Sequence, residues 1–147
     1  MIAIGCDHAG FELKNSIADY LKEKNIEFKD FGTYSAESCD YAVFAEKTAM
    51  AVASGECEKG LLFCGTGVGI SIAANKVKGI RACCASDEFS VEATRLHNNA
   101  NILALGGRVV SEEKAKKLVE IFLTTEFSGD ERHIRRINQI TEIENRQ

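Results

Sequence analysis

A glycine-rich segment, Cys64-Gly65-Thr66-Gly67-Val68-Gly69, constrains the fold of this chain more than any other feature of its sequence. The apolar run 60–63 before it is typical of a buried strand, and the small-residue segment 70–75 after it is typical of a helix. Glycines between a strand and a helix permit a tight turn whose backbone N–H groups face inward. Because those free N–H groups and the helix dipole point the same way, the sequence predicts an anion-binding site at this turn.

Runs typical of strands alternate with helical patterns along the 147 residues. The predicted strands are 2–5, 26–31, 60–63, 79–85 and 102–105. The predicted helices are 11–24, a segment from the capping residue Asp40 to Gly55, 70–75, a segment from Ser86 or Asp87 to His97, a segment capped by Ser111, and 131–145. This alternation favours a single α/β domain, residues 1–147, in which helices cover both faces of a five-stranded parallel sheet and one extra helix ends the chain.

The charge and the cysteine content exclude several classes of protein. A net charge of −4 argues against a general nucleic-acid-binding surface, so we expect no nucleic-acid partner. The six cysteines include no Cys-x-x-Cys pair, which favours reduced thiols over a disulfide framework. Three histidines without Cys/His ligand spacing predict no metal site. Because the chain begins with a strand-like run and has neither a signal-like segment nor an apolar stretch of membrane length, we expect a cytoplasmic protein without a membrane partner.

Polar residues follow several of the predicted strands. Ligands of parallel sheets bind at the carboxyl ends of the strands, so Asp7-His8, the glycine turn and the loop after the fifth strand are predicted to share one edge. His97 precedes the fifth strand, and we expect its helix to bring it back toward that edge. The alternative roles are ordinary ones, a helix cap for Asp7 and a surface position at a helix end for His97.

Cys64 and Thr66 are the candidates for chemistry within the turn. A cysteine at a helix N-terminus is in a setting that favours its thiolate, although a small buried hydrophobe is the more common role of a cysteine. The place of Cys64 before Gly-Thr-Gly favours the functional interpretation. The hydroxyl of Thr66 is suited to bonding a developing oxyanion, to capping the helix, or to both.

The glycine turn differs from two nucleotide-binding motifs. Its third glycine comes one residue too early for G-x-G-x-x-G, although Asp87 lies about twenty residues further on, where an acid that binds a ribose would stand. A helix cap is the simpler role for Asp87. A P-loop is excluded because no Gly-Lys-Ser or Gly-Lys-Thr follows the glycines.

The last predicted helix carries a basic cluster and an unusual apolar stripe. Arg132 and Arg136 are four residues apart and share a face, which suits a phosphate, although a solvated face with acidic neighbours is the simpler reading. An isoleucine recurs at every third position, so the stripe drifts around the helix. This pattern fits contact with two surfaces, such as the domain itself and a partner subunit, or a curved helix on one core. The stripe consists of Ile134, Ile137, Ile140 and Ile143.

Several motifs together resemble those of the type B ribose-5-phosphate isomerases, a family that includes the galactose-6-phosphate isomerase subunits. The resemblance covers nearly the whole chain, and it rests on the segments 5–11, 40–41, 64–76, 79–82, 97–98 and 101–110. It implies a three-layer α/β/α Rossmann-like domain that works without metal or cofactor as a homodimer, or as a dimer of dimers. It also implies the interconversion of ribose 5-phosphate and ribulose 5-phosphate, a step of the pentose phosphate pathway.

The resemblance also implies roles for individual residues. Cys64 is expected to move a proton between C2 and C1, and Thr66, His97 and Asp7 are expected to assist opening of the sugar ring. The enediolate is expected to be stabilised by the backbone of Gly65, Gly67 and Gly69 and by the amide of Asn98. The phosphate is expected to be bound by His8 and Arg108, together with Arg132 and Arg136 of the other subunit. Tyr41 is expected to line the sugar pocket.

The chain departs from the family pattern at a few positions. Ala42 stands where many relatives have proline, Ile70 where one branch has a glutamate base, and Asp130-Glu131 where small residues are usual. The alternative functions are an isomerase of a 6-phosphate hexose, such as allose or galactose 6-phosphate, and a phosphosugar-binding module without catalysis. A single chain that carries Asp7, Cys64 and both arginines favours the pentose enzyme over a two-subunit galactose enzyme.

Overall fold

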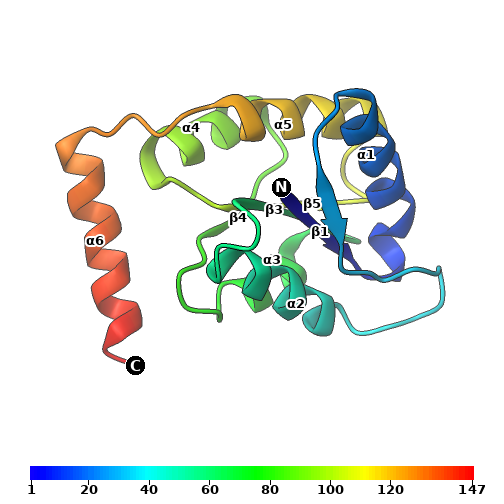
Figure 1. The fold of residues 1–147 in the computed structure, drawn as a ribbon, viewed down its shortest axis with the longest axis horizontal. Coiled ribbons are helices and arrows are strands. Elements are labelled where there is room, and N and C mark those ends of the chain that lie inside the picture. Colours follow the sequence, from blue (N-terminus) through cyan, green and yellow to red (C-terminus); the bar gives the residue numbers. More distant parts are fainter.

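The computed structural model describes residues 1–147, and its five strands form one parallel sheet in the order β2-β1-β3-β5-β4 (Figure 1). The strands are β1 Ile2–Cys6, β2 Phe28–Asp30, β3 Lys59–Cys64, β4 Ala82–Cys84 and β5 Ile102–Gly106. All four neighbouring pairs are parallel, as the alternation of strands and helices predicts. The strand order reverses beside β1, which places a crevice outside the carboxyl ends of β1 and β3.

Helices cover both faces of the sheet, so the predicted three-layer α/β/α architecture is confirmed (Figure 1). One layer contains α1 Phe11–Glu23, α4 Glu88–Asn98 and α5 Glu112–Thr124, and the other contains α2 Tyr41–Ala53 and α3 Val68–Ala74. A single 3-10 turn, His8–Gly10, joins β1 to α1. The terminal helix α6 Glu131–Asn145 lies apart from both layers, at the side of the molecule where α4 ends. None of these helices has the length and apolar character needed to cross a membrane.

The core divides into two halves because successive strand residues point to opposite faces of the sheet. Ile4, Phe63 and Leu105 pack in the half that faces α1, α4 and α5. Ala3 and Cys64 belong to the half that faces α2 and α3. The side chain of Cys64 therefore points toward the helix that follows the glycine turn.

The predicted starts of three elements were wrong by two or three residues, in each case where the backbone turns. β4 does not begin at residue 79, because Gly79 has φ +89° and the chain turns there before it joins the sheet. β2 covers only Phe28–Asp30 of the predicted 26–31, since Asn25 with φ 57° and Gly32 with φ 97° turn the backbone on either side. α3 begins at Val68 instead of residue 70, because Gly67 with φ 82° stands directly before it.

The predicted helix caps are confirmed at two of three positions. The Asp87 carboxylate accepts a hydrogen bond from the Ser90 N–H at 2.8 Å, and this bond lowers the pKa of Asp87. The Ser111 hydroxyl accepts one from the Lys114 N–H at 3.1 Å. Asp40 precedes α2, but its side chain accepts no capping hydrogen bond, so that prediction was wrong. All six cysteines are free thiols.

Candidate active site

Three segments meet at the carboxyl edge of the sheet, beyond the ends of β1, β3 and β5. The Asp7 N–H donates to the Phe63 carbonyl at 3.1 Å. The Gly107 N–H donates to the Cys64 carbonyl at 2.8 Å, and the Arg108 N–H donates to the Gly65 carbonyl at 3.0 Å. The predicted grouping of Asp7-His8, the glycine turn and the loop after the fifth strand at one edge is thus confirmed.

Glycines allow these segments to approach within backbone contact. A Cβ atom at Gly10 would lie 2.7 Å from the Cys64 nitrogen, and one at Gly106 would lie 2.6 Å from the carbonyl carbon of Thr66. Neither position has room for a side chain, because the neighbouring atoms belong to the backbone. The close approach encloses the glycine turn between the ends of β1 and β5.

Cys64 ends β3 with its sulfur directed at the start of α3. The Gly67 N–H donates to Cys64 Sγ at 3.0 Å, and the Cys64 residue is only 5% exposed. Gly67 adopts φ 82°, a conformation that glycine reaches without steric cost and that aims its N–H at the sulfur. A backbone N–H pointed at the sulfur stabilises a negative charge on it.

Thr66 and Arg108 lie beside the turn with their side chains exposed. The Thr66 hydroxyl accepts a hydrogen bond from the Val68 N–H at 3.2 Å, so it caps α3 while its own proton is free to bond a ligand. Arg108 Nη1 lies 3.2 Å from the position a Cβ at Gly65 would take. A hydroxyl and a guanidinium are therefore available within reach of one bound anion.

Tyr41 packs over the other end of the turn. A Cβ at Gly69 would lie 2.8 Å from Cζ of the Tyr41 ring, which shows that the ring lies directly on this glycine. Tyr41 is the first residue of α2, which places its ring at the same sheet edge as the turn.

The side chains of Asp7 and His8 both accept hydrogen bonds from backbone N–H groups. Asp7 is buried, and its Oδ1 accepts hydrogen bonds from the N–H groups of Ala9 at 2.9 Å and Gly10 at 3.0 Å. His8 Nδ1 accepts a hydrogen bond from the Cys39 N–H at 3.2 Å. A neutral imidazole that accepts at Nδ1 carries its proton on Nε2, so His8 presents a donor at Nε2.

His97 and Asn98 do not join this cluster within one chain, which contradicts the expected return of His97 toward the edge. The Gly60 N–H donates to the Asn101 carbonyl at 2.9 Å, so the residues after α4 are level with the beginning of β3. Cys64 lies four residues further along β3, roughly 13 Å away at the rise of a strand. The physical reason is the crossover, in which α4 runs opposite to the strands and ends at their amino edge.

A second polar cluster forms where α4 ends against α6. The rings of His97 and His133 stack with their centroids 4.4 Å apart and 18° between their planes. His133 is buried, and this burial, together with the neighbouring His97 and Arg132, lowers its pKa. Arg132 and Arg136 are exposed on the same helix. Residues predicted to act with Cys64 therefore gather as a separate group.

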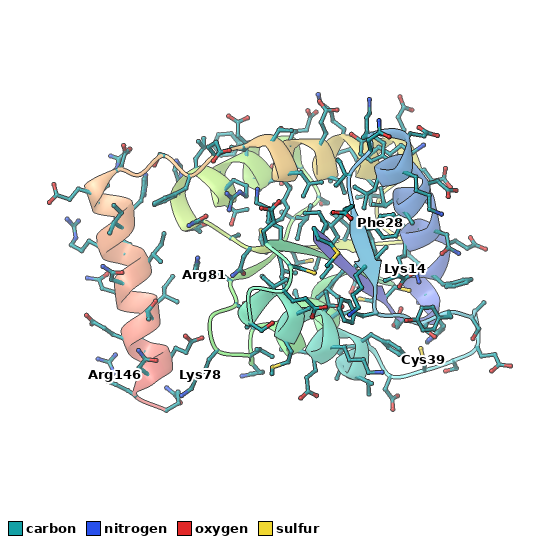
Figure 2. All side chains as sticks on the ribbon, in the orientation of Figure 1. Lys14, Phe28, Cys39, Lys78, Arg81 and Arg146 are labelled. Atoms are coloured by element: carbon teal, nitrogen blue, oxygen red, sulfur yellow. The ribbon has the colours of Figure 1, made fainter.

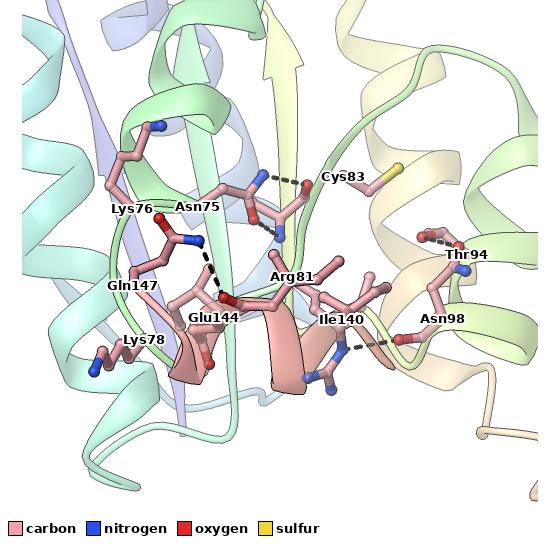
Figure 3. A pocket seen from close by; sticks show the side chains of 14 residues that line it. Asn75, Lys76, Lys78, Arg81, Cys83, Thr94, Asn98, Ile140, Glu144 and Gln147 are labelled. Carbon is pink, nitrogen blue, oxygen red and sulfur yellow. Dashed lines mark hydrogen bonds between the residues drawn. The ribbon is translucent and has the colours of Figure 1, made fainter. Parts of the chain in front are cut away.

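Sequence reasoning assigned no role to Arg81, which holds the end of α4 in place. Its Nε donates to the Asn98 carbonyl at 2.9 Å (Figure 3). Its Nη2 donates to the Asn99 carbonyl, also at 2.9 Å. Burial lowers the pKa of Arg81, although a guanidinium remains charged at any ordinary pH. The only signal in the sequence was its place in the motif 79–82.

A hollow lies between α6, α4 and β4, away from Cys64 (Figure 3). Its volume is about 860 Å³. Apolar side chains of α6, among them Ile140 and Ile143, form one wall, and Arg81 and Asn98 lie on the opposite side. No group of three or more His, Cys, Asp or Glu side chains is placed to hold a metal ion.

Comparisons with known proteins find similar sequences and similar structures. The sequence pattern described as Ribose/Galactose Isomerase matches residues 2–140. Ribose-5-phosphate isomerase B of Escherichia coli is 50% identical over 145 residues, covering 99% of this chain and 97% of that protein. The structure of Clostridium thermocellum ribose-5-phosphate isomerase B superposes with a TM-score of 0.97 at 52% identity, covering 99% of this chain and 97% of the other. The galactose-6-phosphate isomerase subunit LacB of Clostridium acetobutylicum is 40% identical over 143 residues, covering 97% of this chain and 83% of that protein.

Proposed function

The chain belongs to the ribose/galactose isomerase family, and from this premise we propose that it interconverts ribose 5-phosphate and ribulose 5-phosphate with Cys64 as the base. It is an enzyme of the aldose–ketose isomerase class. One observation carries the assignment of the base: Cys64 Sγ accepts the Gly67 N–H at 3.0 Å, at the start of α3 and beside the exposed Thr66 and Arg108.

The reaction requires a base and a stabilised oxyanion. In the open-chain aldose, the Cys64 thiolate removes the proton from C2, and the electron pair moves onto the C1 carbonyl oxygen to form an enediolate. The thiol then returns the proton to C1, and a proton moves from the C2 hydroxyl to the C1 oxygen. The developing charge is stabilised by those backbone N–H groups of the turn 65–69 that are not already bonded to Cys64 or Thr66. Stabilisation of this kind by fixed donors is the largest contribution in many enzyme reactions.

Recognition of the phosphate falls to His8 and Arg108 at the same edge. His8 donates through Nε2 because its Nδ1 already accepts the Cys39 N–H. The Arg108 guanidinium provides a planar pair of donors that matches a phosphate. Tyr41, which lies over Gly69, lines the sugar between the phosphate and the base.

The second cluster acts in the site of another copy of the chain. His97, Asn98, Arg132 and Arg136 are too far from Cys64 in one chain, and they are gathered at one end of the molecule by the contact of α4 with α6. A symmetric dimer would supply the missing donors to each site, with His97 assisting ring opening beside Asp7 and Thr66 of the other subunit. Asn98 would then add an amide to the enediolate contacts.

The surface of the chain supports such a dimer. Of the 15 residues of α6 only His133 is buried, and a helix of this length is marginal in water without a packed face. Ile134, Ile140 and Ile143 of α6 are 44%, 47% and 53% exposed. On α3, Val68 and Ile72 are 51% and 57% exposed and lie one turn apart. Contact between α3 of one copy and the hollow beside α6 of the other covers both apolar surfaces.

The test is turnover of ribose 5-phosphate by the purified chain without added metal, beside Cys64→Ala and Cys84→Ala. Loss of the base is expected to lower kcat by about two to four orders of magnitude. Cys84 is a matched control, since it is an exposed thiol that donates to the Thr66 carbonyl at 3.7 Å and has no chemical role in the proposed mechanism. Full activity of a folded Cys64→Ala protein would show that another residue is the base.

The similarity to a galactose-6-phosphate isomerase subunit makes hexose 6-phosphates the second candidate substrates. The same preparation assayed on allose 6-phosphate and galactose 6-phosphate distinguishes the two. A higher kcat/KM for a hexose 6-phosphate than for ribose 5-phosphate would make the hexose the substrate and would be consistent with the same thiolate mechanism. Binding of phosphosugars with no turnover on any of them would leave a binding module without catalysis.

A further inference from the structure

Lys14 is the one lysine of the chain whose charge lies inside the protein. It is 1% exposed, and Figure 2 labels it on α1 beside the sheet. Its Nζ lies 2.8 Å from Asp30 Oδ2 and donates to the Thr33 carbonyl at 2.6 Å. The rings of Phe11 and Tyr34 each have their centroid 5.4 Å from Nζ. The mechanism described above makes no use of this group.

Stability alone does not account for a buried ammonium at this position. Transfer of a charge out of water costs several kcal/mol, which an ion pair repays only in good geometry, and an apolar side chain of similar volume often stabilises as well or better. We therefore look for the function of Lys14 in the groups that it binds. Its contacts with Asp30 and with the Thr33 carbonyl hold the beginning of the segment 31–40, which connects β2 to α2.

The segment 31–40 is tied to the rest of the protein at two places. Near its start, the Thr33 N–H donates to the Cys6 carbonyl at 2.8 Å, and the Thr33 carbonyl accepts from Lys14 and from Cys6 Sγ. Near its end, the Cys39 N–H donates to His8 Nδ1. Residues 34–38 between these two ties are exposed.

The exposed middle of the segment makes no hydrogen bond beyond its own neighbourhood. The Tyr34 hydroxyl donates to the Asp30 carbonyl at 2.8 Å, and the Glu37 N–H donates to the Ser35 hydroxyl at 3.4 Å. The position of the Cys39 N–H at His8 therefore depends on how the segment leaves the sheet at Thr33. Figure 2 shows Cys39 on this segment, apart from Lys14 on α1.

We propose that Lys14 is a positioning residue for His8. By holding the Thr33 carbonyl and the Asp30 carboxylate, Lys14 sets the course of the segment 31–40, and the Cys39 N–H then keeps His8 in the tautomer that donates from Nε2. The proposal deepens the proposed function, since it rests on His8 as a phosphate ligand. The proton on Nε2 is what a phosphate oxygen requires from a neutral imidazole.

The test is a double-mutant cycle of Lys14→Met and His8→Ala, with Lys22→Met as a matched control. Lys22 lies on the same helix and is exposed. Lys14→Met is expected to raise the KM for ribose 5-phosphate and the inhibition constant of inorganic phosphate by about tenfold, the range of one hydrogen bond to a charged group, with kcat changed less than threefold. In a chain that already carries His8→Ala, Lys14→Met is expected to add nothing.

A spectroscopic readout separates this proposal from the proposed function. Nitrogen-15 NMR of the His8 ring reports which nitrogen carries the proton, and Lys14→Met is expected to convert the fixed Nε2–H tautomer into a mixture. If His8→Ala leaves KM unchanged, the phosphate role of His8 fails, while the NMR result still decides the role of Lys14. An unchanged His8 spectrum, or a Lys14→Met effect that adds fully to that of His8→Ala, would overturn the proposal.

A second variant guards against a failure of Lys14→Met to fold. Asp30→Asn removes the ion pair and leaves the bond from Lys14 to Thr33, and the Asp30 side chain is 27% exposed, so water can solvate the replacement. The same changes in KM and in the His8 spectrum are expected at smaller size. A folded Asp30→Asn protein with the wild-type KM and the wild-type His8 spectrum would also contradict the proposal.

Discussion

Mixed dimers provide the sharpest test of a site shared between two copies of the chain. One variant carries Cys64→Ala and the other carries Arg132→Ala together with Arg136→Ala. Each homodimer is expected to be inactive, the first because both sites lack the base and the second because both lack two phosphate ligands. The arginines are exposed on α6, so their replacement leaves the fold of each chain intact.

The expected activity of the mixture follows from the arrangement of the residues. In a mixed dimer, the site that contains the intact Cys64 receives both arginines from the Cys64→Ala chain, so it is complete. The other site carries both defects. Random exchange of equal amounts makes half of the dimers mixed, and one site of two is complete in each. The mixture should therefore reach roughly one quarter of the wild-type kcat per subunit.

The assay requires exchange of subunits and a measurement of turnover at saturating ribose 5-phosphate. The two variants are mixed in mild denaturant and refolded together, and differently tagged chains allow the mixed species to be purified, for which roughly half of the wild-type kcat is expected. His97→Ala in place of the arginine variant should complement Cys64→Ala in the same way. Mixed dimers that are isolated and stable, and yet inactive, would refute the shared site and place all catalytic groups within one chain.

Three further predictions concern the turn, the thiols and the second histidine. Gly67→Ala should lower the free energy of unfolding by at least about 1–2 kcal/mol, because φ is 82° and the new Cβ would lie 2.9 Å from the Leu105 carbonyl carbon. The same variant should lower kcat by about 100-fold, because the backbone N–H that donates to Cys64 is displaced. Gly79 also has a positive φ, 89°, but no atom lies within 4 Å of the position of a new Cβ, so Gly79→Ala should show a loss of stability in denaturation without the loss of turnover. After alkylation, mass spectrometry should find Cys84 labelled both with and without ribose 5-phosphate, and Cys64 protected from the reagent by ribose 5-phosphate. Cys6 should stay unlabelled, because burial raises its pKa to about 12. Labelling of Cys64 that ribose 5-phosphate does not slow would contradict its place in the site. Burial lowers the pKa of His133 below its ordinary value of 6.5, so the unfolded chain binds the proton more readily, and stability should be lost as the pH falls from 6.5 through the folded pKa. His133→Phe, which keeps a ring against His97, should flatten this part of the stability profile in thermal unfolding, and an unchanged profile would assign the pH dependence to other groups.

Much of the fold was predictable because its signals are local. Apolar runs, glycines and capping residues recur at distances of a few residues, and they identified five strands, the helices between them and the single edge at which Asp7-His8, Cys64 and the loop after β5 meet. The errors in the ends of β2 and β4 have a local cause as well. Positive φ angles at Asn25 and Gly79 end the extended backbone, and neither residue type reveals its φ in the sequence.

The prediction for His97 was wrong for a reason that the parallel sheet itself supplies. A helix that connects two parallel strands runs from the carboxyl edge of the sheet back to its amino edge, so the end of α4 that carries His97 lies at the amino edge. Only the tertiary structure shows that His97 stacks there against His133 of α6. The same contact separates the predicted site into two groups, which is the structural reason to seek the second group on a partner.

The sequence by itself determined the class of the fold and the residues at the carboxyl edge, because strand periodicity and the glycine turn are properties of neighbouring residues. Only the tertiary structure decided which groups the charged side chains of Lys14 and Arg81 bind. Lys14 follows Leu13 on a helix whose pattern gives no sign of a buried lysine, and Arg81 directly precedes the short strand β4. In the folded protein the first binds the Thr33 carbonyl and the second binds the end of α4. Such partners lie 17 or more residues away in the chain. A charged side chain takes its role from the groups that surround it in the folded protein, and those groups are set by the packing of the whole chain.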